Sequence, residues 1–131
     1  MGSAKSVPLN RRRFRRLVER ALVGLPDDFR ARLQNVAVIV EDRPSPALLR
    51  DLGLAEDDLL FGLYEGLPLT EWGRDDLLRI PDRIRIFQGP IEDACESDDE
   101  IVSEVRSTVL HEVGHHFGLS DEELERYERE G

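Results

Sequence analysis

Cysteine is nearly absent from this sequence of 131 residues, in which Cys95 is the only one. A single cysteine has no partner for a disulfide within the chain, and such usage is typical of proteins from a reducing compartment. We therefore expect a cytoplasmic protein. Long apolar runs are missing as well: no stretch approaches the roughly 20 residues that a membrane-spanning helix requires. We expect no membrane segment.

Basic residues are outnumbered by acidic ones. The chain has 18 Lys and Arg against 28 Asp and Glu, which gives a net charge of −10. This balance argues against general nucleic-acid binding, because the phosphate backbone attracts positively charged proteins. The hydrophobic content of 40% is still that of a globular chain and not of a disordered one. The length argues for one domain, so we expect a flexible tail over 1–7, a single domain over 8–131 and a monomer.

The two signs of charge are concentrated in different segments. Residues 5–20 carry seven basic side chains and one acid, whereas residues 92–104 carry seven acids and no base. Two separate solvated faces are the simpler interpretation. The alternative is that a basic first helix docks beside the acidic segment.

Hydrophobic periodicity predicts an α+β fold, with a small mixed sheet of three or four strands packed on N-terminal helices, a long helix and a short C-terminal helix. Strands are expected over Asn35–Glu41, Leu59–Glu65 and Asp82–Gln88. Helices are expected over about 8–23, from Pro26, over 46–52, from Asp98 or Asp99 to about Phe117, and over 121–129, with a loop over 67–79.

The strands differ in the polarity of their two faces. Asn35–Glu41 is apolar on both faces, which predicts a central position in the sheet. Asp82–Gln88 alternates isoleucine with arginine, which predicts an edge strand with one wet face. Gly62 and Gly66 in the remaining strand region suggest a bulge or a close approach of another backbone.

The three histidines lie within six residues and form the pattern His111-Glu112-x-x-His115. On a helix, His111 and His115 lie one turn apart on the same face, so both imidazoles can reach one metal ion. Glu112 is turned aside from that ion and is placed to act as a general base on a water at the metal. The pattern therefore predicts a zinc-dependent hydrolase.

A catalytic zinc normally has three protein ligands, and Asp121 is the candidate for the third. Gly118 permits a sharp turn after the helix, and Asp121 follows three residues later, where the turn could bring it back towards the metal. A competing interpretation is that Ser120-Asp121-Glu122-Glu123 is a capping box, with Ser120 as the cap and Glu123 as its partner. Both interpretations hold together if Ser120 does the capping.

Other side chains near the motif leave alternatives open. Glu122 or Glu125 could be the third ligand in place of Asp121. Tyr64 and Tyr127 could each stabilise an oxyanion or simply lie at the edge of the core. His116 points away from the ligand face and is expected to pack against its neighbours.

The run His111-Glu112-x-x-His115-x-x-Gly118-x-x-Asp121 resembles the long zinc-binding motif of the metzincin metallopeptidases. Over about residues 10–125 the chain also resembles the small bacterial zincin-like metallopeptidase family. The matching segments are Leu25-Pro26, Asn35-Val36-Ala37-Val38, Gly62-Leu63-Tyr64-Glu65-Gly66, Pro81-Asp82-Arg83-Ile84 and the run from His111 to Asp121. The resemblance implies a zincin-like fold, one catalytic Zn²⁺ held by His111, His115 and Asp121, and Glu112 as the base in peptide-bond hydrolysis.

A peptide or protein substrate could add to an exposed strand edge through main-chain hydrogen bonds. The resemblance and the predicted edge strand point to substrate contacts at Arg83, Ile84, Arg85, Ile86 and Phe87. Two other functions remain open. One is a zinc-binding domain that holds a peptide with little or no turnover, and the other is a metal-dependent hydrolase of a different substrate.

Overall fold

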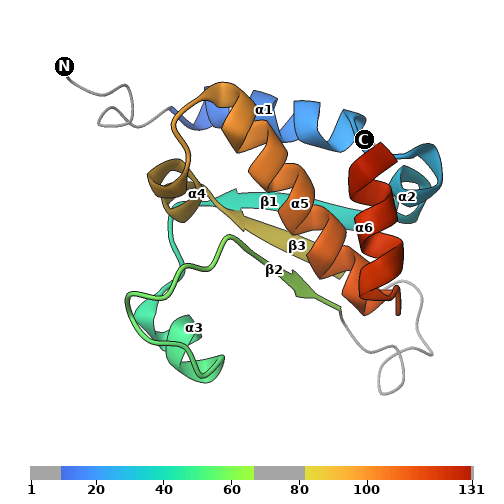
Figure 1. Ribbon diagram of the computed structural model, residues 1–131. Helices are drawn as coiled ribbons and strands as arrows, with labels where there is room; N and C mark the ends of the chain where they lie inside the picture. The colour runs from blue at the N-terminus through green and yellow to red at the C-terminus, as the bar shows by residue number, and fades with distance from the viewer. Residues whose placement is uncertain (1–9, 67–81, 131) are drawn as a thin grey trace, which may run out of the picture.

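The computed structural model describes residues 10–66 and 82–130. Within these ranges three strands and six helices confirm the predicted α+β class (Figure 1). The strands are β1 (Val36–Glu41), β2 (Gly62–Glu65) and β3 (Asp82–Phe87). The helices are α1 (Arg11–Val23), α2 (Asp27–Arg32), α3 (Pro46–Asp51), α4 (Gln88–Ala94), α5 (Asp98–His116) and α6 (Asp121–Glu130). The predicted tail over 1–7 and loop over 67–79 lie outside the described residues.

The long helix α5 begins at Asp98, the first of the two predicted starts. The Ser97 hydroxyl accepts a hydrogen bond from the main-chain N–H of Glu100 at 3.2 Å, so Ser97 is the N-cap. Asp98 and Asp99 lie in the first turn instead, where their charge interacts favourably with the helix dipole. No helix of the described ranges is both long and apolar enough to cross a membrane.

The sheet order is β1-β3-β2, so β3 lies in the middle. It pairs in parallel with β1 and antiparallel with β2, and Ile84 faces Val38 on one side and Tyr64 on the other. The prediction of an edge strand over Asp82–Gln88 is therefore wrong. The prediction of a central strand over Asn35–Glu41 is also wrong, because β1 pairs only with β3 in the described part of the chain.

Ion pairs explain why an arginine-rich strand can lie inside the sheet. Arg85 donates to Glu41 of β1 at 2.8 Å and to Glu65 of β2 at 3.3 Å. Arg83 donates to Glu65 at 2.5 Å, and this hydrogen bond is the main reason why the pKa of Glu65 is lowered. Opposite charges on neighbouring strands thus satisfy the polar face of β3. The alternation of isoleucine and arginine revealed which face is polar but not whether the strand had a free edge.

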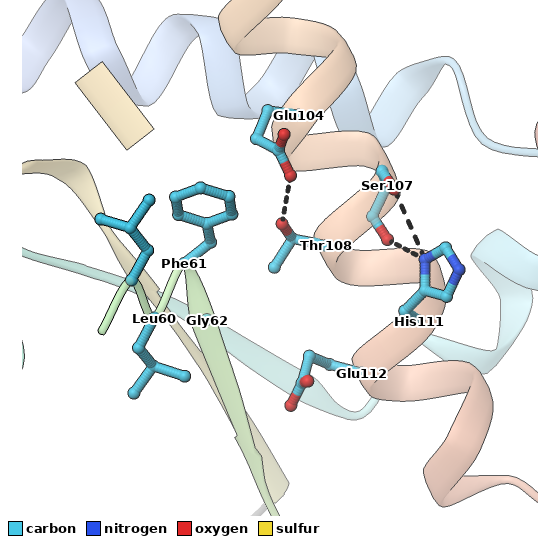
Figure 2. Close-up of a pocket in the computed structure, with 9 residues that line it drawn as sticks. Leu60, Phe61, Gly62, Glu104, Ser107, Thr108, His111 and Glu112 are labelled. Atoms are coloured by element: carbon cyan, nitrogen blue, oxygen red, sulfur yellow. Dashed lines mark hydrogen bonds between the residues drawn. The ribbon is translucent and has the colours of Figure 1, made fainter. Parts of the chain in front are cut away.

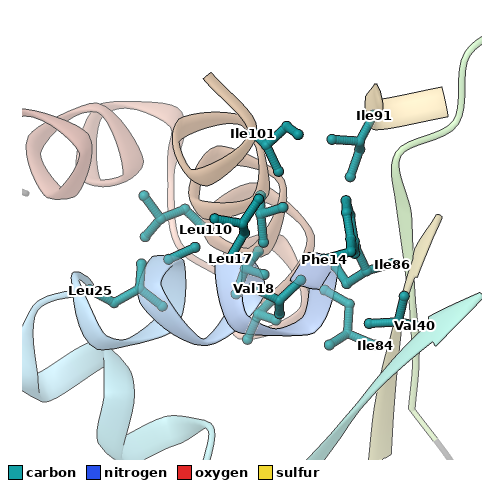
Figure 3. Packing of buried hydrophobic residues seen from close by; sticks show 14 of the residues in the cluster. Phe14, Leu17, Val18, Leu25, Val40, Ile84, Ile86, Ile91, Ile101 and Leu110 are labelled. Carbon is teal, nitrogen blue, oxygen red and sulfur yellow. The ribbon is translucent and has the colours of Figure 1, made fainter. Parts of the chain in front are cut away.

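The hydrophobic core lies between the sheet and the helices α1 and α5, which cross the same face of the sheet (Figures 1 and 3). The two isoleucines of β3, Ile84 and Ile86, are fully buried in this core. The helices contribute a further set of fully buried side chains, Phe14 from α1 and Val105, Val109, Leu110 and Val113 from α5. The packing fixes the position of α5, which contacts both β2 and β3.

The short helix α4 is not predicted by the sequence, because a Gly89-Pro90 pair after a strand is typical of a turn. Pro90 instead lies in the first turn of α4, where a missing N–H costs no helical hydrogen bond. Ile91 of this helix is fully buried in the core. The acidic segment therefore begins inside a helix and not in a loop.

The basic α1 lies beside the acidic start of α5. Arg13 donates to Asp98 at 2.6 Å, and Arg20 donates to Asp99 at 3.4 Å. These pairs confirm that the basic helix docks beside the acidic segment. Exposed ion pairs add little stability, so the apolar contacts between the two helices contribute more to their association.

Candidate metal centre

His111 is held in one orientation by the preceding turn of α5. Its Nδ1 atom lies 2.8 Å from the main-chain carbonyl oxygen of Ser107. Because a carbonyl oxygen only accepts hydrogen bonds, the neutral tautomer that fits this contact has its proton on Nδ1 and a lone pair on Nε2. This arrangement is typical of metal-binding histidines, whose other ring nitrogen donates to a carbonyl or carboxylate.

Gly118 turns the chain back towards the histidines. Its φ of +79° is in the left-handed region that glycine adopts without strain. The turn places Asp121 Oδ1 at 3.3 Å from Nε2 of His115. The predicted return of Asp121 towards the histidine turn is confirmed. That it binds a metal stays a prediction.

The hydrogen bonds that cap the N-terminus of α6 do not involve the Asp121 side chain. The Ser120 hydroxyl accepts a hydrogen bond from the N–H of Glu123 at 3.2 Å, and Glu123 accepts one from the N–H of Ser120 at 2.9 Å. These reciprocal hydrogen bonds are the predicted capping box. Ser120 therefore caps the helix while the Asp121 carboxylate faces His115.

The structure brings the three predicted ligands together only in part. Asp121 faces His115, and the ring centroids of His111 and His115 are 6.0 Å apart. No three His, Cys, Asp or Glu side chains within residues 10–66 and 82–130 are close enough to hold a metal ion as they stand. The donor types nevertheless fit zinc, because two imidazoles one helical turn apart and a nearby carboxylate are common zinc ligands. The available Nε2 of His111 agrees with this assignment.

Glu112 projects towards the sheet. Its Oε1 atom accepts a hydrogen bond from the main-chain N–H of Tyr64 at 3.2 Å. Tyr64 belongs to β2, which pairs with β3 on its other side. This N–H therefore lies on the edge of β2 that pairs with no strand within residues 10–66 and 82–130, which we call the free edge of β2. The carboxylate of the predicted base is therefore located between the histidine turn and a strand edge.

A pocket of about 300 Å³ lies beside Glu112, between α5 and the segment that leads into β2 (Figure 2). Gly62 allows the strand to pass this close to the helix, because a Cβ atom there would lie 2.7 Å from Cγ2 of Thr108. The lining residues are Leu59, Leu60, Phe61, Gly62, Glu104, Ser107, Thr108, His111 and Glu112. The pocket was not predicted from the sequence, in which Gly62 indicates only that another segment passes close to this strand.

The C-terminal helix α6 docks on the same part of α5. Leu124 is fully buried and packs against Gly114, where any side chain would collide with it. Arg106 donates to the carbonyl oxygen of Tyr127 at 2.9 Å, and the Ser107 hydroxyl donates to Glu128 at 2.8 Å. These contacts fix the helix whose first residue is Asp121.

The sequence profile of the zincin-like metallopeptidase family matches residues 33–130. The chain belongs to this family. The matched region contains the whole sheet, the histidine turn and Asp121, so the resemblance seen in the sequence is confirmed. The solved structure of a conserved hypothetical protein from Thermo thermophilus is similar to this zincin-like chain, with 30% sequence identity and a TM-score of 0.55. The similarity covers 81% of this chain and 92% of that chain, and no curated protein matches.

Two tyrosines near the zincin-like centre have carboxylate partners. The Tyr64 hydroxyl donates to Asp82 at 2.5 Å, and burial together with Asp82 raises the pKa of Tyr64. The Tyr127 hydroxyl donates to Asp28 at 2.8 Å. Neither hydroxyl is oriented as an oxyanion donor in this arrangement. His116 packs against the ring of Tyr64 with the centroids 4.2 Å apart, as predicted.

The predicted peptide-binding strand cannot receive a peptide in this zincin-like fold. Both edges of β3 are occupied by β1 and β2, so its main chain has no free side for another strand. The edge position on which the prediction of strand addition at Arg83, Ile84, Arg85, Ile86 and Phe87 depends is therefore wrong, and no observation tests substrate contact by these residues. Three of these side chains are buried in the core, and the two arginines are ion-paired. The free edge next to Glu112 belongs to β2.

Replacing Asp121 tests its role as third ligand in this family member. We expect Asp121→Ala to weaken zinc binding by at least about 10-fold, because it removes a carboxylate from the ligand set. Glu122→Ala removes the same charge from the same helical turn, so it tests the alternative ligand and should keep the wild-type affinity if Asp121 is the ligand. Affinities measured by competition with a zinc chelator would contradict the role if the two variants bind zinc equally well.

Proposed function

We propose that the protein is a zinc-dependent peptidase. The observation that carries this proposal is the position of Glu112, whose carboxylate lies next to the His111 turn and 3.2 Å from a main-chain N–H on the free edge of β2. In the proposed site, Glu112 as the base thus lies between the histidine turn and a strand edge at which a peptide could pair. Membership of the zincin-like metallopeptidase family supports the same function.

One zinc ion would be held by His111, His115 and Asp121. When bound, zinc supplies a Lewis acid that polarises the scissile carbonyl and lowers the pKa of a water molecule. Glu112 takes a proton from the attacking water and delivers it to the nitrogen of the leaving amine. The hydrogen bond from Tyr64 N–H holds the Glu112 carboxylate at the strand edge, where a bound peptide would lie.

An extended peptide or a segment of a protein would pair with the free edge of β2 through its main chain. Because β2 lies beside Glu112, this position brings the peptide bond next to the base. Glu41 and Glu65 already neutralise the arginines of β3, so those arginines do not favour acidic substrates. The main chain of β2 replaces β3 as the proposed substrate contact.

The alternative function is a zinc-binding domain that holds a peptide with little or no turnover. The hydrogen bond between Tyr64 N–H and the Glu112 carboxylate favours it, because this contact occupies a lone pair that a water molecule would otherwise use. We further propose a cytoplasmic monomer that does not bind nucleic acid. The single cysteine, buried at Cys95, and the net charge of −10 support this proposal.

Zinc content and peptide cleavage test the function together. We expect the protein purified without chelator to contain about one zinc per chain and to cleave a mixed peptide library only while zinc is present. His115→Ala should lose both properties. His116→Ala is the matched control, because it removes the neighbouring histidine, which packs on Tyr64.

The outcomes separate the two functions. Zinc binding without cleavage by the wild-type protein would contradict the peptidase and support the peptide-holding domain. Absence of zinc above background would contradict both. Equal zinc loss in the two histidine variants would contradict the assigned ligands.

A further inference from the structure

One carboxylate in the pocket beside Glu112 forms no ion pair with a basic side chain in the part of the chain that the structure describes. Glu104 lies on α5 and lines the pocket together with Glu112 (Figure 2). Its Oε2 atom accepts a hydrogen bond from the Thr108 hydroxyl at 3.2 Å. No Lys, Arg or His of the described ranges forms an ion pair with Glu104.

The surroundings of Glu104 destabilise the charged form of its carboxyl group. The residue is only partly exposed, and this burial raises the pKa of its carboxyl group. Thr108 and His111 offset part of the rise in pKa, whereas the nearby Glu128 carboxylate adds to it. A desolvated carboxylate is stabilised most by a cation that donates hydrogen bonds to it. The pocket therefore favours a positively charged group.

The opposite wall of the pocket is apolar. Figure 2 shows Leu60 and Phe61 across the pocket from Glu104 and Thr108. A lysine or arginine side chain has a matching structure, since its aliphatic stem packs on apolar surface while its head binds a carboxylate. A volume of about 300 Å³ is at the lower end for ligand pockets and suits one long side chain.

We propose that Glu104 determines substrate specificity, by binding the lysine or arginine side chain of a peptide residue close to the scissile bond. The position of the pocket supports this role, because the same pocket is lined by Glu112 and His111. The inference rests on the proposed peptidase function. It assigns a substrate class, peptides with a basic residue at the cleavage site, to that function.

The test compares two peptides of equal charge with wild-type protein and with Glu104→Gln. One peptide carries a single lysine beside the cleaved bond and norleucine at a remote position, and the other has these two residues exchanged. We expect wild-type protein to favour the first peptide by about 10- to 100-fold in kcat/KM, as one charge-assisted hydrogen bond allows. The ratio should fall to about 3-fold or less in Glu104→Gln.

A control variant separates the pocket from general charge attraction. Glu19→Gln removes one negative charge from the exposed surface of α1 and should keep the wild-type ratio. A charge reversal, Glu104→Lys, should turn the preference towards a peptide with glutamate at the same position. A wild-type ratio near one, or an unchanged ratio in Glu104→Gln, would overturn the proposal.

Binding measurements distinguish failure of this inference from failure of the peptidase function. The dissociation constants of the same two peptides are measured by fluorescence anisotropy with Glu112→Gln, in which cleavage is suppressed. A preference for lysine at the pocket in binding, without any cleavage by wild-type protein, would contradict the peptidase function and support the assignment of the pocket. Equal binding of both peptides would overturn the assignment.

Discussion

Glu112→Gln should lose nearly all peptide hydrolysis and still bind zinc. We expect kcat/KM to fall about 100- to 10,000-fold, which is the contribution of a positioned general base. Glutamine has nearly the same shape, and its amide oxygen can still accept the hydrogen bond that Tyr64 N–H gives to Glu112 at 3.2 Å. It cannot take a proton from water, so the substitution removes the chemistry and keeps the local structure.

The measurement is a progress curve on a cleaved peptide, with zinc content determined on the same sample. Thermal unfolding of the zinc-loaded variant should match that of the wild type. Retention of more than about a tenth of the wild-type kcat/KM would assign the base to another residue. Loss of zinc in the same variant would instead place Glu112 among the ligands.

Phe14→Ala should be among the most destabilising single substitutions in the chain. Phe14 is fully buried where α1 packs on α5, within the cluster that contains Ile84 and Ile86 of β3. Removing a buried phenylalanine side chain costs about 3–5 kcal/mol of unfolding free energy, since transfer energy is lost and a cavity remains. The variant would therefore lose a large part of the free energy of unfolding that is typical of a domain of this size.

Urea unfolding of both proteins measures the loss directly. Arg15→Ala is the matched control, because Arg15 is the exposed neighbour on the same helix and should change the stability by less than about 0.5 kcal/mol. A loss below about 1 kcal/mol for Phe14→Ala would show that the core does not depend on the contact between α1 and α5.

The parts of the site that depend on local geometry could be predicted from the sequence. His111 and His115 share a helix face because of their spacing, and the left-handed turn at Gly118 follows from the residue type. Ser120 could be assigned as the cap because its partner Glu123 is three residues away. In each case the interacting groups are close in the chain.

The parts that depend on distant segments could not be predicted. The arginines of β3 have the same alternation in an edge strand and in an internal strand, and the difference lies in Glu41 and Glu65 on the neighbouring strands. Likewise Glu104 becomes a pocket residue only because the segment around Phe61 packs opposite α5. In both cases the interacting residues are far apart in the sequence, so local patterns do not indicate that they are in contact.

The docking of α6 has a consequence for the proposed metal centre. Asp121 is the first residue of a helix that is attached to α5 by Leu124, by the Arg106 hydrogen bond and by the hydrogen bond from Ser107 to Glu128. If Asp121 coordinates zinc, metal affinity and the attachment of this helix are thermodynamically linked, and the linkage is reciprocal. Weakening the contact of Leu124 with Gly114 would lower zinc affinity, and zinc would protect the amide hydrogens of the C-terminal helix from exchange.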